Sequence, residues 1–429
     1  MNEISFIDKL KSRDLLYYLI EKTVRKRYVL SEKNVFTKQS KLLKHMLKYA
    51  KIFVPYYKGL GANDITDFPI ISKRDLMNEF DVFCSIKKDK YSYSNSFTGG
   101  STGEPLRVLN SGSLETDFGA KRWDYYGFKQ GDLLLSCDGS KIDDILLKKS
   151  IYWKEKHKKD IPFGRYSLSS LYLNDDNAEI YCNYIKDLHP TFMRGYPSFI
   201  YSLACYAEKM NINLHFIKGI ELTSEIAYPY QIQKMKEVYG AKIYLQYGHT
   251  ESCVCAYTYD ESYRYRVEPL YGYVEVLDEH GNHVKENEIG EVVVTSLSNF
   301  AMPLIRYRTG DYAEYGGKDN RYVYFNQVVG RTQDYIVNRE GYKVILTALI
   351  FAQHFKAMDN ISKWQLEQFE KGKVIAHIIK GEKYSPSDEK ELTDLFNNSG
   401  NVELIFDYVE DIPLTPRGKS KMLVQHMEL

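Results

Sequence analysis

Strand-like and helix-like runs alternate between about residue 90 and residue 300, and no other feature of this chain restricts its fold as strongly. The apolar runs at 132–136 and 242–246 have the length of buried strands, whereas 198–210 has the length and spacing of a helix. Alternation of this kind is typical of layered α/β structure. The sequence therefore predicts an α/β fold for this part of the chain.

Two further parts of the chain have recognisable patterns. Two amphipathic stripes predict helix within residues 1–60, formed by Leu15, Leu16, Leu19 and Ile20 and by Leu42, Leu43, Met46 and Leu47. Within 271–297, two runs of alternating apolar residues flank polar residues at 279–282, which predicts a β-hairpin with its turn there.

The C-terminal hundred residues have a different pattern of predicted elements. A helix is expected near 347–355, and strands are expected near 362–369, 373–379 and 402–409. The best helix signal is Ser385 as N-cap, Pro386 in the first turn and the stop at 397–400. These elements predict a small α+β domain of ordinary size. We place the boundary within 330–334, giving a large domain at 1–331 and a small domain at 332–429.

Composition excludes several classes of protein. The 429 residues carry a formal net charge of +1, so no basic field attracts nucleic acid or an anionic membrane. No apolar run approaches the roughly 18 residues that a membrane span needs, and the start of the chain lacks the pattern of a signal peptide. The six scattered cysteines argue against a disulfide framework. We therefore expect a cytoplasmic, reducing location.

A glycine-rich loop, Thr98-Gly99-Gly100-Ser101-Thr102-Gly103-Glu104-Pro105, is the first of five short polar motifs. Its glycines let backbone N–H groups point at one anion, and its hydroxyls add donors, so it suits phosphates. A P-loop kinase is excluded because the loop lacks a lysine. The loop matches the G-x-S-x-G hydrolase elbow, but the polar run before it is not the buried strand that an elbow needs.

The second motif is Tyr247-Gly248-His249-Thr250-Glu251. The tyrosine ring can stack on a base, Thr250 can donate to phosphate, and Glu251 can bind a hard cation through oxygen. A histidine at this place is most often just a polar residue at a strand end, and a role of His249 in lining the acyl pocket is the minority hypothesis. His249, Cys253 and Cys255 also suggest zinc, but no fourth ligand lies at a familiar spacing.

Three further motifs contribute Asp311, Arg331 and Lys419, within Arg308-Thr309-Gly310-Asp311, Gly330-Arg331-Thr332-Gln333-Asp334 and Pro416-Arg417-Gly418-Lys419. An acid and an arginine can hold a ribose, and a lysine can reach a reacting centre. Taken alone, Asp311 could be a commonplace residue of a glycine turn, Arg331 an ordinary surface charge, and Lys419 is best explained as a solvated lysine. Only the order and spacing of the five motifs make a strong case for nucleotide chemistry on a carboxylate.

Together the motifs resemble the adenylate-forming superfamily, which includes acyl-CoA synthetases, luciferases and peptide-synthetase adenylation domains. The resemblance runs from about residue 90 to the end. Gly195-Tyr196-Pro197-Ser198, Leu222-Thr223-Ser224-Glu225 and the short N-terminal part look most like the phenylacetate–coenzyme A ligase branch, of the type encoded with capsular polysaccharide biosynthesis. This implies a large multi-sheet N-terminal domain and a small α+β lid joined by a hinge at Gln333 or Asp334.

The resemblance also implies ATP and Mg²⁺ as cofactors and a role for each matching residue. Catalysis would fall to Lys419, Thr250 and Glu251, with Glu251 as the magnesium ligand, and Tyr196 and His249 would contact the acid. The nucleotide would be held by Thr98, Gly99, Gly100, Ser101, Thr102, Gly103, Ser224, Glu225, Tyr247, Gly248, Asp311 and Arg331.

The function expected from this resemblance is an ATP-dependent carboxylic acid ligase that works through an acyl-AMP. Coenzyme A is the default acceptor of the branch, and an amine or amino sugar is the rival. Glu104 stands where the family's loop has lysine, which leaves open a nucleotide-binding scaffold without catalysis. Dimers occur in similar proteins, so a homodimer stays open as well.

Overall fold

The computed structural model describes residues 34–91, 93–98, 106–111, 114–129, 131–155, 166–331, 335–346, 349 and 356–427. They form two compact units. The first unit comprises the described residues of Met1–Leu134, Glu155–Tyr166 and Tyr244–Val328, and the second those of Leu135–Lys154, Ser167–Ile243 and Val329–Leu429.

The first unit begins with helix α3, Val35–Phe53. Its stripe of Leu43, Met46 and Leu47 is buried in the core of this unit, as predicted, because residues three and four apart share one face of a helix. The other stripe, Leu15 to Ile20, lies outside the described residues. Shorter helical segments follow: η1 (Pro55–Tyr57), η2 (Ile65–Asp67), α4 (Lys73–Asn78), α5 (Phe80–Phe83), η3 (Lys88–Lys90) and α6 (Leu114–Tyr125).

The strands of the first unit form two arrangements. Strands β1 (Tyr93–Phe97) and β2 (Arg107–Ser111) pair antiparallel. The others follow the order β11-β12-β13-β14-β10-β9-β8. Their bounds are β8 (Lys242–Gly248), β9 (Cys255–Tyr257), β10 (Tyr265–Val267), β11 (Gly272–Leu277), β12 (Ile289–Ser296), β13 (Tyr307–Lys318) and β14 (Val323–Arg331). The expected hairpin is confirmed as β11–β12, in which Gly272 pairs with Ser296.

A bulge interrupts the pairing of β12 with β13. Val293 pairs with Arg308 and Glu291 pairs with Tyr312, so β13 gains two residues over its partner between these positions. Gly310, with φ of +74°, lies in the extra stretch, where the left-handed backbone favours glycine. Asp311 lies in the same stretch, so the bulge sets the direction of its side chain.

The second unit contains α/β layers with strand order β7-β6-β3-β5-β4. The elements are β3 (Leu134–Asp138), α7 (Asp144–Leu147), β4 (Trp153–Glu155), β5 (Tyr166–Ser169), η4 (Ser170–Tyr172), α8 (Ala178–Leu188), β6 (Phe192–Gly195), α9 (Pro197–Lys209), β7 (Gly219–Thr223) and α10 (Pro229–Tyr239). β3 begins two residues later than predicted, because the Asp132 carboxylate accepts the Lys129 N–H in a turn. The predicted helix at 198–210 is confirmed as α9.

The strands β6 and β7 run parallel, so their carboxyl ends lie at one edge of the sheet. β3 ends beside β6: the Tyr196 N–H donates to the Cys137 carbonyl at 3.2 Å. A Cβ on Gly195 would lie 1.9 Å from that same oxygen, which explains why glycine is needed there. This edge therefore brings together the residues that follow the three strands.

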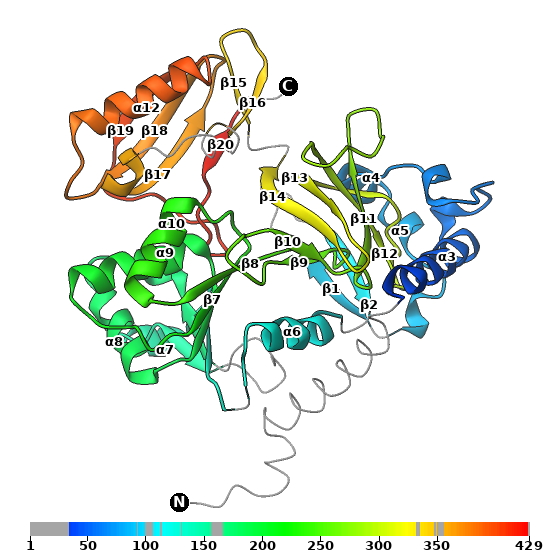
Figure 1. The fold of residues 1–429 in the computed structure, drawn as a ribbon, viewed down its shortest axis with the longest axis horizontal. Helices are drawn as coiled ribbons and strands as arrows, with labels where there is room; N and C mark the ends of the chain where they lie inside the picture. Colours follow the sequence, from blue (N-terminus) through cyan, green and yellow to red (C-terminus); the bar gives the residue numbers. More distant parts are fainter. Residues whose placement is uncertain are drawn as a thin grey trace, which may run out of the picture. The chain divides into compact units, whose positions relative to one another are not determined.

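The C-terminal part of the second unit is the small α+β domain that was predicted. Its elements are β15 (Tyr335–Val337), β16 (Lys343–Ile345), η5 (Lys356–Asn360), β17 (Ile361–Gln368), β18 (Lys373–Lys380), α12 (Pro386–Asn398), β19 (Glu403–Tyr408) and β20 (Leu423–Gln425). α12 covers one face of the sheet β19-β18-β17-β20 (Figure 1). Ser385 caps α12 in a capping box with Asp388, as its sequence predicts.

The overall architecture is thus α/β, with a large multi-sheet part and a small C-terminal α+β domain. Nearly all of the helix expected at 347–355, and the proposed pivot residues Gln333 and Asp334, lie outside the described residues. The boundary between domains and the hinge therefore stay predictions. No helix among the described residues is long and apolar enough to cross a membrane.

A row of charged side chains crosses the small domain's sheet. His377 on β18 lies 2.8 Å from both Glu367 Oε2 and Asp407 Oδ2, one on each ring nitrogen, and His426 Nε2 lies 2.8 Å from Glu367 Oε1. Carboxylates only accept hydrogen bonds, so satisfying both neighbours requires a doubly protonated His377 ring. Burial alone would lower the pKa of His377, but the two carboxylates outweigh it and raise the pKa.

This row predicts a pH-dependent stability. The folded pKa of His377 is raised above the unfolded value of about 6.5, so its contribution is complete below that pH and is lost as pH rises through the folded pKa. We expect His377→Gln to lower the unfolding free energy by about 1 kcal/mol at pH 6 and by less at pH 9. Denaturant unfolding at both values checks this. The exposed His215→Gln is the control, and a His377→Gln effect that does not change with pH would contradict the interpretation.

Candidate active site

The turn after β8 presents the motif that begins at Tyr247. The Ser252 N–H donates to the His249 carbonyl at 3.1 Å, and Ser252 has φ of +54°, a backbone state that is uncommon outside glycine. The Asn110 side-chain amide donates to the Thr250 carbonyl at 2.7 Å and ties β2 to this turn. The backbone of residues 249–252 is therefore fixed by both local and distant contacts.

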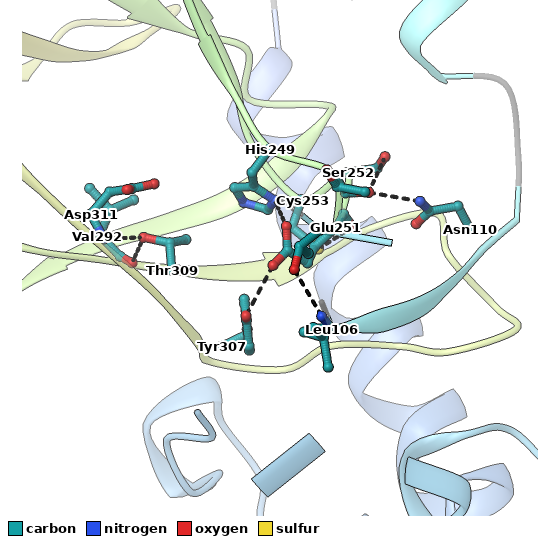
Figure 2. Close-up of polar contacts among 12 residues, drawn as sticks. Leu106, Asn110, His249, Glu251, Ser252, Cys253, Val292, Tyr307, Thr309 and Asp311 are labelled. Carbon is teal, nitrogen blue, oxygen red and sulfur yellow. Dashed lines mark hydrogen bonds and ion pairs between the residues drawn. The ribbon is translucent and has the colours of Figure 1, made fainter. Parts of the chain in front are cut away.

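Glu251 is buried at this turn, and both of its carboxylate oxygens have a neighbour (Figure 2). The Tyr307 hydroxyl donates to Oε1 at 3.0 Å, and His249 Nδ1 lies 3.0 Å from Oε2. Burial by itself raises the pKa of Glu251, but the interactions with His249 and Tyr307 outweigh it and lower the pKa to about 2. A carboxylate therefore stays ionised inside the protein at neutral pH.

An ionised, fixed carboxylate of this kind fits a magnesium ligand. Mg²⁺ commonly takes one or two protein carboxylates and completes its shell with phosphate oxygens and water. Each Glu251 oxygen has a second lone pair beyond its present neighbour. Across the described part of the chain, no group of three His, Cys, Asp or Glu side chains is placed to hold a metal by itself. His249, Cys253 and Cys255 do not form such a group, and burial raises the pKa of the Cys253 thiol, which disfavours the thiolate that zinc needs.

Asp311 and Tyr247 form a second polar pair in the same unit. The Tyr247 hydroxyl donates to Asp311 Oδ2 at 2.8 Å, and the Asp311 N–H is bound by the Thr309 hydroxyl. Thr309 in turn donates to the Val292 carbonyl across the bulge (Figure 2). The structure thus brings two of the predicted nucleotide residues together. Arg331 ends β14, and its side chain lies outside the described residues.

The glycine-rich loop connects β1 to β2. Residues 99–105 lie outside the described residues, so only the base of the loop is defined. There Thr98 and Leu106 pair twice: the Thr98 N–H donates to the Leu106 carbonyl, and the Leu106 N–H donates to the Thr98 hydroxyl. The strand before the loop, β1, has no buried residue, and this agrees with the argument against a hydrolase elbow.

In the second unit, the motif that contains Lys419 forms a tight loop, residues 415–420, called here the Lys419 loop. The Gly418 N–H donates to the Thr415 carbonyl and the Thr415 N–H to the Lys419 carbonyl, at 2.7 and 2.9 Å. The Thr415 hydroxyl accepts the Lys419 N–H. Pro416 at the second position of this turn restricts the backbone further. Lys419 therefore projects from a closed turn.

The Lys419 loop packs directly on the residues that follow β3 and β5. A Cβ on Gly139 would lie 1.7 Å from the Arg417 carbonyl, and one on Gly418 would lie 2.2 Å from Ser170 Oγ. The Ser170 hydroxyl donates to the Gly418 carbonyl at 2.8 Å. Only glycine permits backbone segments to approach this closely.

The Lys419 ammonium lies at the carboxyl edge of β6 and β7. Its Nζ donates to the Ser224 carbonyl at 3.2 Å and lies 5.5 Å from the centre of the Tyr196 ring, within the range of a cation–π interaction. Tyr196 precedes α9 and Ser224 follows β7. Three predicted site residues, distant in sequence, are thus brought together by the ends of neighbouring strands.

Glu225 lies beside them, and its carboxylate binds backbone groups. Oε1 accepts the Ser420 N–H at 2.7 Å, and Oε2 accepts the Ser198 N–H at 3.1 Å. Burial raises the pKa of Glu225 even though these donors and Lys419 act in the opposite direction. From the sequence, Glu225 was expected to border the adenine. In the structure, its two carboxylate oxygens accept hydrogen bonds from the Ser420 and Ser198 N–H groups.

Several residues that build these sites were not identified from the sequence. Tyr307, one of 38 tyrosines, carries no local signal that would mark it as the partner of Glu251. Asn110, Gly139 and Ser170 were missed for the same reason. The positions of Gly139 and Gly418 in polar loops were the available hint, since glycine there permits close approach.

Two family models and one curated protein match this chain. The family described as AMP-binding enzyme matches residues 169–302, and the family described as CapK C-terminal domain matches residues 336–426. Protein CapK of Staphylococcus aureus is 24% identical over 388 residues, which cover 86% of this chain and 82% of that protein.

Two solved structures show the same fold at low identity. A 2-hydroxyisobutyryl-CoA ligase in the postadenylation state with R3-HIB-AMP has a TM-score of 0.68 at 15% identity, over 90% of this chain and 88% of that one. The acyl acid amido synthetase AtGH3.15 in complex with 2,4-DB has a TM-score of 0.62 at 15% identity, over 91% and 89%. The chain thus contains an AMP-binding enzyme domain and a CapK C-terminal domain, and it shares its fold with ligases of the adenylate-forming superfamily.

Proposed function

We propose that this enzyme activates a carboxylic acid with ATP to an acyl-adenylate, releases pyrophosphate and transfers the acyl group to an acceptor in surface polysaccharide biosynthesis. The observation that carries the proposal is the position of Lys419, whose ammonium is held at the carboxyl edge of β6 and β7 by a closed loop. The pathway is the one that the resemblance to the capsular-polysaccharide type implies, and Protein CapK matches most of this chain.

In the first half-reaction a carboxylate oxygen of the acid attacks the α-phosphorus of ATP. The bond from that phosphorus to the bridging oxygen breaks, and pyrophosphate leaves. Lys419 offsets the negative charge that develops on the transferring phosphoryl group, and its fixed position lowers the reorganisation required.

Glu251 is the residue that would hold Mg²⁺ in this reaction. The ion supplies Lewis acidity toward phosphate oxygens when bound. The chain's own contribution is to keep the Glu251 carboxylate ionised and oriented through Tyr307 and His249. Asp311, fixed by Tyr247, offers its carboxylate to the ribose hydroxyls, and the Tyr247 ring can lie against the base.

In the second half-reaction the acceptor's nucleophile attacks the acyl carbon, AMP leaves, and the nucleophile loses its proton to solvent. Coenzyme A is the acceptor that we propose, as the default of the phenylacetate–coenzyme A ligase branch. An amine or amino sugar is the alternative, and the structural neighbours include both a CoA ligase and an amido synthetase. A scaffold without catalysis would not require an ionised buried Glu251 and a fixed Lys419.

A pyrophosphate-release screen over aryl, fatty, hydroxy and amino acids tests the proposal. We expect at least one class to give ATP-dependent release that requires Mg²⁺. Competition between coenzyme A and amines for the activated acid then identifies the acceptor. Absence of release with every class would support the scaffold instead.

Replacement of Lys419 should affect chemistry more than binding. We expect Lys419→Ala to slow acid-dependent pyrophosphate exchange about 100- to 1,000-fold, because one charge that stabilises the transition state is lost. AMP binding, measured by calorimetry, should persist. Lys371→Ala, an exposed lysine after β17, is the control. Exchange by Lys419→Ala at the wild-type rate would remove this residue from the mechanism.

Replacement of Glu251 should change the metal requirement. Glu251→Gln removes the charge, so we expect exchange to fall about 100-fold and half-saturation to need more Mg²⁺. Since the pKa of Glu251 is about 2, the Mg²⁺ requirement of the wild type should not reflect its titration between pH 6 and pH 8. Magnesium titrations at both pH values measure this, with the exposed Glu279→Gln as control. An unchanged requirement in Glu251→Gln would place the metal elsewhere.

A further inference from the structure

Glu225 links two backbone segments of the second unit that are far apart in sequence. One carboxylate oxygen binds the Ser420 N–H, immediately after Lys419, and the other binds the Ser198 N–H, in the first turn of α9. The first N–H groups of a helix have no partner within the helix and favour negative charge. One Glu225 oxygen therefore accepts a hydrogen bond from the first turn of α9, and the other holds the Lys419 loop.

The backbone beside Glu225 is in an unusual conformation. Ser224 has φ of +71°, a left-handed state that costs free energy in residues other than glycine. Its carbonyl accepts the hydrogen bond from Lys419 Nζ. The turn at 224–225 therefore binds the side chain of Lys419 through Ser224 and the following backbone through Glu225.

We propose that Glu225 is a positioning residue for adenylation, which holds the Lys419 loop by its backbone so that the ammonium is placed for the first half-reaction. This rests on the proposed function and adds a role that differs from contact with adenine. Glu225 acts through Lys419 and not on the nucleotide. If the small domain turns between half-reactions, the bond from Ser420 to Glu225 must break for Lys419 to leave.

Three observations favour this role over a contact with the nucleotide. Both Glu225 oxygens accept a backbone N–H, so the carboxylate is already oriented within the protein. The carboxylate is buried, and burial raises its pKa, so it lies away from solvent among protein groups. The loop that it holds also makes the close contacts of Gly418 with Ser170 and Gly139.

Amide hydrogen exchange on the protein without substrates tests the contact directly. We expect the Ser420 amide to exchange at least about tenfold faster in Glu225→Ala, and the Ser198 amide to follow, because each loses its acceptor. Glu225→Gln keeps one accepting oxygen, so it should protect at most one of the two. Amides of β17 and β18 serve as the internal check that the small domain is folded.

Steady-state pyrophosphate exchange tests the consequence. In Glu225→Gln, kcat should fall about tenfold while KM for ATP changes less than about twofold, because the defect lies in placing Lys419. A residue that binds adenine would instead raise KM for ATP. The matched control is Glu382→Gln, since Glu382 makes an exposed ion pair with Lys209 between the same two parts of the second unit.

The two measurements separate the possible failures. Unchanged exchange of the Ser420 amide in both Glu225 variants overturns the proposed contact, and a rise in KM for ATP alone overturns the positioning role. If the wild type shows no pyrophosphate exchange with any acid, the proposed function fails. The amide measurement still decides whether Glu225 holds the Lys419 loop.

Discussion

The close approach of the Lys419 loop to the ends of β3 and β5 is the contact on which the second unit's chemistry depends. Gly139 and Gly418 permit it, since a Cβ on either would overlap neighbouring atoms. Lysine has a long flexible side chain, and its position is usually poorly defined. Here the packing of the Lys419 loop fixes the backbone of Lys419. Contacts with the Ser224 carbonyl and the Tyr196 ring then fix the position of its ammonium. Placement by backbone packing is the kind of preorganisation that electrostatic catalysis requires.

Two buried carboxylates illustrate how environment separates their roles. Glu251 interacts with side chains, and these lower its pKa and leave lone pairs for a cation. Glu225 binds two backbone N–H groups, and burial still raises its pKa. The first arrangement leaves an ionised carboxylate with free lone pairs, as the proposed magnesium ligand requires, whereas the second joins two segments of the chain. Identical side chains can thus differ in role because their neighbours differ.

The fold could be predicted well wherever its signals are local. The cap of α12, the buried stripe of α3 and the β11–β12 hairpin each follow from residues close in sequence. The start of β3 lies two residues later than predicted, because a local turn at Asp132 precedes the strand. At the sites, the sequence identified the candidate catalytic and binding residues, but it did not identify the residues that hold them in place. Tyr307 is 56 residues from Glu251 and Ser170 is 248 from Gly418, and no spacing rule connects such pairs.

The segment Leu222-Thr223-Ser224-Glu225 shows why a short motif can carry more than one function. Its first two residues are buried at the end of β7, which fixes the strand in the sheet. The left-handed Ser224 then turns the chain, so that one carbonyl meets Lys419 while the next side chain meets Ser420. An ordinary backbone at residue 224 would redirect both contacts together. The strain is therefore offset by two interactions at once, and the motif behaves as a single unit that fixes the position of Lys419.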